Sequence, residues 1–270
     1  MLVPLDGSAF AERAIGPATV LAKRLGVDVG VVQVVEHEKD ADDAYLTKVV
    51  REHGLAWHHV AVDDDVAGAI VAVADARDAA VCMATHGHGR AAAVIGSTAE
   101  ALLARSEEPI VAVGRGVDTQ RIRRIDRIVV TLDGSEEAEA VCKPAIAWAR
   151  QLGLVVNLIT VVGEPMTALR DDEPPRRAFG LSDPEAYIAS ALERHQTEGV
   201  DIVGEVLTDP ISPASGLATL LRDVPHCVLA MATHNRSGTA RLIHGSVAAS
   251  IVDAAPVPVV LFTHAQLRNA

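Results

Sequence analysis

One fold is encoded twice in this chain, because four short landmarks each occur a second time in the same order. The paired segments are residues 2–8 (LVPLDGS) and 129–135 (VVTLDGS), 83–86 and 231–234 (MATH in both), 96–97 and 245–246 (GS in both), and 109–111 (PIV) and 258–260 (PVV). Self-similarity of this kind marks a duplicated structural unit. Two unrelated domains can share one turn motif, but they would not share four landmarks in the same order.

The spacing between the two copies changes at two places. The first landmark recurs after 127 residues, the second after 148 and the last two after 149. The first change means that the second copy carries about 21 extra residues, which include the charged, proline-broken segment 173–177 (EPPRR). Such a segment suits a surface excursion. The second change means that the first copy lacks one residue between Thr85 and Gly96.

Within each copy, short apolar runs alternate with helical patterns. In the first copy, strands are predicted at 2–5, 29–35, 57–62, 80–84 and 110–113, and helices at 11–25, 42–53, 67–77 and 97–105. The second copy repeats this order from Ile128 to Phe262. Strands and helices that alternate in this way form βαβ units, with a parallel sheet between two layers of helices.

We therefore predict an α/β protein of two tandem doubly wound parallel-sheet domains of the Rossmann-like type. The expected domains are residues 1–114 and 127–270, joined by a linker at 115–126. Several arginines make this linker basic. We interpret it as a solvated tether, with a binding patch as the alternative.

The composition limits the partners that the chain can have. Its net charge of −12 argues against nucleic acid and against anionic membranes, since both attract a positive surface. No apolar run is long enough to span a bilayer, and the first residues lack an apolar h-region, so we expect neither a membrane span nor a signal peptide. Cys82, Cys142 and Cys227 lack CxxC spacing and lie in or beside apolar segments, as reduced and buried cysteines do. We expect a cytoplasmic protein that binds neither nucleic acid nor membrane.

Three motifs in each copy resemble the universal stress protein family. The first strand ends in Asp-Gly-Ser, the fourth leads into Thr-His, and a Gly-Ser pair opens the next helix. Each copy resembles the family, so the resemblance extends over nearly the whole chain. It implies the adenine nucleotide alpha hydrolase-like fold. It also implies binding of ATP, or of ADP or AMP, through a Gly-x2-Gly-x9-Gly-[Ser/Thr] motif, with Mg²⁺ arriving only with the phosphates.

The strand ends support such a site on physical grounds. In an open parallel sheet, ligands bind beyond the carboxyl ends of the strands, where the strand order reverses. A glycine pair lets backbone N–H groups approach an anion, and a helix N-terminus favours one. This arrangement holds phosphate without net positive charge, so it is compatible with an acidic protein.

The first copy holds seven candidate nucleotide-binding residues: Pro4, Asp6, Val34, Gly87, Gly96, Ser97 and Thr98. By the resemblance, Asp6 contacts adenine or ribose and the backbone at Val34 touches adenine. Both residues also have plainer explanations, because Asp-Gly-Ser is turn chemistry and any buried strand valine resembles Val34. Two departures weaken the motif. Ala84 replaces its first glycine, and eight residues instead of nine separate Gly87 from Gly96.

The second copy holds four candidates: Asp133, Val161, Gly245 and Ser246. Its loop has the full nine-residue spacing, but Ala232 and Asn235 replace the two glycines. Asparagine tolerates left-handed backbone, although its side chain would enter the phosphate path. We therefore favour the first copy as the nucleotide site.

No motif nominates a metal site or a catalytic residue. The 11 histidines show no paired ligand spacing, and there is no Walker lysine, nucleophile elbow or dinucleotide fingerprint. We expect no dedicated metal and, at most, slow ATP hydrolysis.

Two functions remain open. The first, implied by the resemblance, is a stress-response regulator that changes its contacts with an unidentified protein partner when nucleotide binds. The second is an interaction or scaffold module that keeps the fold and has lost the ligand. The last strands, 110–113 and 259–262, are short and apolar, and an exposed apolar edge is a template for pairing. We predict that these two strands pair with each other within the chain. The sequence leaves open whether two chains also form a homodimer.

Overall fold

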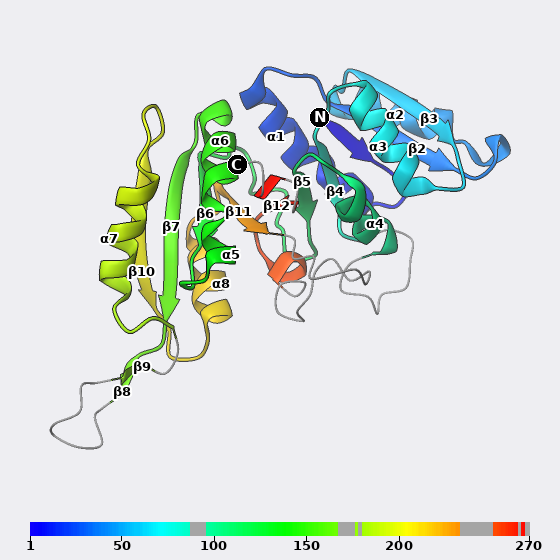
Figure 1. Cartoon of the computed structure of the whole chain (residues 1–270). Coiled ribbons are helices and arrows are strands. Elements are labelled where there is room, and N and C mark those ends of the chain that lie inside the picture. Colours follow the sequence, from blue (N-terminus) through cyan, green and yellow to red (C-terminus); the bar gives the residue numbers. More distant parts are fainter. Residues whose placement is uncertain (87–95, 167–175, 178–179, 233–250, 264–265, 268–270) are drawn as a thin grey trace, which may run out of the picture.

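The computed structural model describes residues 1–86, 96–166, 176–177, 180–232, 251–263 and 266–267. One ten-stranded sheet runs through both copies in the order β10-β7-β6-β11-β12-β5-β4-β1-β2-β3 (Figure 1). The first copy supplies β1 (Leu2–Pro4), β2 (Gly30–Val35), β3 (Trp57–Val62), β4 (Val81–Ala84) and β5 (Ile110–Val113). The second supplies β6 (Arg127–Thr131), β7 (Val155–Val162), β10 (Ile202–Thr208), β11 (Cys227–Ala232) and β12 (Val259–Phe262).

Each copy is a doubly wound parallel domain, as the sequence predicts. The chain moves outward from β1 through β2 to β3, and then returns to the other side of β1 for β4 and β5, all in parallel. The second domain repeats this path with β6, β7, β10, β11 and β12. The strand order therefore reverses twice, between β1 and β4 and between β6 and β11.

The two domains join edge to edge, which confirms the predicted pairing of the last strands. β5 and β12 are antiparallel, and Val111 lies opposite Val260. Both strands are buried along their whole length. Each domain thus covers the apolar edge that the other would expose.

Helices cover both faces of the sheet. They are α1 (Ile15–Leu25), α2 (Asp43–His53), α3 (Val66–Ala76), α4 (Ser97–Arg105), α5 (Glu136–Glu139), α6 (Cys142–Leu152), α7 (Pro184–His195) and α8 (Pro213–Asp223), with 3-10 turns at η1 (Ala11–Ala14) and η2 (Glu38–Asp40). The predicted helix 11–25 therefore starts with a 3-10 turn. α1 ends at Gly26, whose φ of 67° lies in the left-handed region that glycine tolerates. No helix in the part of the chain described here is long and apolar enough to cross a membrane.

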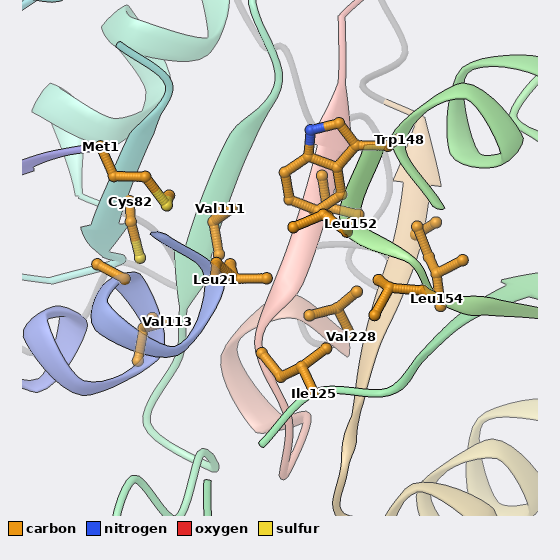
Figure 2. Close-up of a cluster of buried hydrophobic side chains, with 14 of the residues drawn as sticks. Met1, Leu21, Cys82, Val111, Val113, Ile125, Trp148, Leu152, Leu154 and Val228 are labelled. Carbon is orange, nitrogen blue, oxygen red and sulfur yellow. The ribbon is translucent and has the colours of Figure 1, made fainter. Parts of the chain in front are cut away.

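The core forms two layers that continue across the domain boundary. One layer lies under α1, α2, α6 and α7, and the other under α3, α4 and α8. Figure 2 shows Leu21 and Val111 of the first domain close to Trp148 and Leu152 of the second. The Arg24 guanidinium also donates to the carbonyls of Leu152 (3.2 Å) and Gly153 (3.1 Å) at the end of α6. A cation there stabilises the helix C-terminus, so α1 and α6 are tied together.

The linker is not a solvated tether, contrary to our interpretation of its sequence. Val117, Ile122 and Ile125 are buried and belong to the core layer under α1 and α6. The Arg13 guanidinium donates to the carbonyls of Arg115 and Val117. The apolar residues alternate with the arginines, so the linker can bury one set while the charges of the other stay in water.

The extra residues of the second domain lie mainly between β7 and α7. β8 (Pro165–Met166) and β9 (Arg176–Arg177) form a two-stranded antiparallel sheet there. It extends past the end of β7, away from the main sheet (Figure 1). Residues 173–175 of the proline-broken segment lie outside the described residues.

The three cysteines are buried and free, and they provide a test of the core. Burial raises the pKa of Cys82, Cys142 and Cys227 to about 12 in each case. At pH 8 the reactive thiolate is therefore scarce. We expect an aromatic disulfide reagent to label none of them in the folded protein within minutes and all three after unfolding in guanidinium. Rapid labelling of any thiol without denaturant would contradict this burial.

Candidate functional site

Each domain has a cavity beyond the carboxyl ends of its strands, at the point where the strand order reverses. The first-domain cavity measures about 320 Å³ and lies at the ends of β1, β2 and β4, next to the start of α3 and α4. Six of the seven first-copy candidates line it: Pro4, Asp6, Val34, Gly96, Ser97 and Thr98. Gly87 lies outside the described residues. Side chains and backbone from well-separated segments thus surround one space.

Asp6 both builds the turn after β1 and lines the cavity. Its Oδ1 accepts hydrogen bonds from the Ser8 N–H (3.0 Å) and the Ser8 hydroxyl (2.6 Å). The Ser8 oxygen in turn accepts from the Ala11 N–H (3.1 Å). The turn role that the sequence allows for Asp6 is therefore real, and the exposed carboxylate still faces the cavity.

Asp133 repeats this geometry in the second domain. Its Oδ1 accepts from the N–H and hydroxyl of Ser135 at the same distances, 3.0 and 2.6 Å. The Ser135 oxygen accepts from the Ala138 N–H at 3.1 Å. These three hydrogen bonds are the same in both turns, so they do not distinguish the two sites.

The N-terminus of α4 forms another wall of the first-domain cavity. Gly96 precedes the helix with extended backbone and offers no side chain to cap it. Its N–H donates to the Thr85 carbonyl (2.8 Å), and a methyl group built on Gly96 would lie 3.2 Å from that oxygen. The helix start is therefore held tightly against the end of β4. Helix N-terminal N–H groups and a favourable dipole attract anions at such a position.

His86 also lines this cavity, and the sequence predicted no role for it there. Its Nδ1 lies 2.9 Å from the Thr85 hydroxyl and 3.6 Å from Oδ1 of Asp253. The ring packs edge-to-face on Phe10, with centroids 5.7 Å apart. Because Asp253 belongs to the second domain, that domain reaches His86 in the wall of the first-domain cavity, although Asp253 does not line the cavity itself.

Arg115 of the linker holds Asp253 in place. Its Nε donates to both carboxylate oxygens (3.0 and 2.9 Å), and its Nη2 donates to Oδ2 (2.6 Å). These hydrogen bonds raise the pKa of the Arg115 guanidinium. Nothing in the sequence links residues so far apart, so only the folded sheet reveals the cluster.

The second-domain cavity occupies the equivalent place and measures about 540 Å³. Asp133 and Val161 line it, whereas Gly245 and Ser246 lie outside the described residues. Gly180 and Leu181, from the extra segment after β7, line it as well. Both cavities fall within the range of roughly 300–1,000 Å³ that small-molecule sites occupy. Within the described ranges, no group of three or more His, Cys, Asp or Glu is placed to hold a metal ion.

The fold and its two strand-end cavities define a tandem Rossmann-like α/β protein. The model of the universal stress protein family matches residues 36–114 and 124–263, which together make up most of the chain. The chain therefore belongs to the universal stress protein family. Residues 1–35, which carry β1 and Asp6, lie outside the matched segments, although the structure repeats their fold in the second domain.

Solved structures share the complete tandem fold. A universal stress protein from Archaeoglobus fulgidus DSM 4304 is 18% identical, with a TM-score of 0.61 and 97% of each chain covered. A putative universal stress protein from Pseudomonas aeruginosa UCBPP-PA14 is 15% identical, with a TM-score of 0.59 and 99% of this chain and 94% of that one covered. A universal stress protein solved in complex with cAMP matches 50% of this chain and 95% of its own, at 22% identity and a TM-score of 0.40. No curated protein matches the chain.

Proposed function

We propose that the first domain binds an adenine nucleotide, ATP before ADP or AMP, and that the protein is a cytoplasmic stress-response regulator. Nucleotide binding would alter its contacts with a protein partner. One observation carries the proposal: six of the first-copy candidates, from separate segments, line a single cavity at the reversal of strand order. This is where open parallel sheets bind their ligands.

The residues divide into two groups by chemistry. Asp6 and the backbone at the end of β2 offer hydrogen-bond acceptors and donors to the base and ribose. The start of α4 offers uncapped N–H groups and the hydroxyls of Ser97 and Thr98 to the phosphates. Backbone donors and a helix dipole supply positive potential without a lysine, which suits a chain with a net charge of −12. Mg²⁺ would accompany the phosphates.

The proposal predicts that Asp6→Ala weakens ATP binding at least about tenfold, because a charge-assisted hydrogen bond contributes roughly 1.5–3 kcal/mol. Titration calorimetry with ATP and AMP, with and without Mg²⁺, measures the change. Asp133→Ala is the matched control, since it removes the same turn hydrogen bonds in the other domain. We expect it to leave the affinity within about twofold.

A second variant tests the phosphate side of the cavity. Gly96→Val places a branched side chain against the Thr85 carbonyl, where even a methyl group is tight. We expect saturable binding to disappear. If the wild-type protein shows neither heat nor a thermal shift at millimolar nucleotide, the proposal fails and the interaction module remains.

A further inference from the structure

Two residues of the extra segment lie beside Val161 and the turn of Asp133, on the side of the second-domain cavity where the proposed function would place the base. Gly180 has a φ of 89° and rests on the end of β7. A methyl group built on it would lie 3.2 Å from the Val161 carbonyl oxygen and 2.8 Å from Cγ1 of Val162. Both the backbone angle and the close approach require glycine at this position.

Leu181 covers the turn that follows β6. Its Cδ2 lies 2.6 Å from the place where a methyl group on Gly134 would stand. Gly134 follows Asp133, so the leucine side chain lies directly against the Asp-Gly-Ser turn. Together, Gly180 and Leu181 contact Val161 and the turn of Asp133, the two places in this domain that correspond to Val34 and Asp6 in the first.

The first domain has no such cover among its described residues. Those that line its cavity come from β1, β2 and β4, from the turns after them, from η1, and from α3 and α4, but not from residues 36–42 after β2. That segment forms the turn η2, and the Asp42 N–H donates to the Gln33 side chain (3.1 Å). Seven residues bridge β2 to α2, whereas residues 163–183 separate β7 from α7, and of these Gly180 and Leu181 lie against the ends of β7 and β6.

We propose that Gly180 and Leu181 determine which domain takes the nucleotide, because they occupy the base position of the second domain. The chain would then bind one nucleotide, in the first domain. This inference rests on the proposed function. The second cavity is the larger of the two, so its size is not what excludes a nucleotide. Leu181 packs against Gly134 and Gly180 against the end of β7, so a base that takes these places must displace the half-buried leucine, which costs affinity.

Titration calorimetry with ATP and Mg²⁺ tests the inference through stoichiometry. We expect one nucleotide per wild-type chain and two per Leu181→Ala chain. In the double variant Gly96→Val, Leu181→Ala, we expect one, bound in the second domain. Leu192→Ala is the matched control, since this half-buried leucine of the same domain packs against Gly204 and does not line the cavity. It should leave the stoichiometry at one.

The outcomes separate the two proposals. A wild-type chain that binds two nucleotides, or a Leu181→Ala chain that still binds one, overturns the inference and leaves the proposed function intact. A wild-type chain that binds none refutes the proposed function, and the inference with it. Thermal unfolding of each variant shows whether a lost site reflects lost folding, and Leu181→Gly provides a second way to remove the side chain.

Discussion

Val111→Asp is expected to lower the free energy of unfolding by about 4 kcal/mol or more. Val111 is fully buried in β5, between Cys82 of β4 and Val260 of β12. An aspartate there would place a carboxyl group among apolar side chains on a strand with neighbours on both sides. If this carboxyl group were ionised, its charge would have no partner. If it were protonated, it would still lose its hydration. Because β5 joins the two domains, both should lose stability.

Val62→Asp is the matched control for this prediction. Val62 lies at the end of β3, which forms one edge of the sheet, and 54% of its surface is exposed. The same substitution there keeps the carboxylate in water, so we expect a change within about 0.5 kcal/mol. Urea unfolding followed by tryptophan fluorescence measures both variants, since Trp57 and Trp148 report on one domain each. Equal losses at the two positions would contradict the central place of β5.

Gly116→Ala is expected to destabilise the protein by about 2–3 kcal/mol through steric overlap alone. A methyl group on Gly116 would lie 2.1 Å from the Ala254 carbonyl oxygen and 2.8 Å from that of Ala255. Both are backbone atoms, which cannot rotate away as a side chain can. The Gly116 N–H also donates to the Asp253 carbonyl (2.8 Å), which holds the linker against the second domain. Its φ lies outside the left-handed region, so backbone strain does not contribute.

Gly16→Ala supplies the control, because it adds the same methyl group where no atom beyond its chain neighbours and its own helix backbone lies within 4 Å. Gly16 lies in α1, and alanine favours helix over glycine by up to about 1 kcal/mol. We expect this variant to be as stable as the wild type or more so in thermal unfolding. If Gly116→Ala were equally stable, the linker would not be seated on the second domain as the structure shows.

Most of the fold could be predicted because it depends on local patterns. The strands Trp57–Val62, Ile110–Val113 and Val259–Phe262 and the helix Ser97–Arg105 have the predicted limits. Alternation of strand and helix then leaves few topologies, since parallel crossovers share one hand. The sequence did not predict the burial of the linker, because its arginines indicate a solvated segment. Its three buried residues stand singly among polar ones, so they form no apolar run.

The candidate site is predictable only where it depends on strand ends. Residues that follow neighbouring parallel strands must meet at one edge of a sheet, and this brings Asp6 and Val34 to the same cavity as Ser97. The contact between His86 and Asp253 depends on how two domains meet. The position of Leu181 depends on a contact with Gly134, which lies far from it in the chain. Neither leaves a periodic trace in the chain.

The sequence by itself therefore determined the duplication, the α/β class and the pairing of the last strands, because each follows from apolar periodicity and turn chemistry repeated in register. Tertiary structure decided how the two copies differ. The same three hydrogen bonds hold both Asp-Gly-Ser turns, yet Leu181 lies against one of them, whereas Asp253 approaches His86 in the wall of the cavity beside the other. The physical reason is that packing between distant segments is set by shape and reach in three dimensions, which local pattern does not encode.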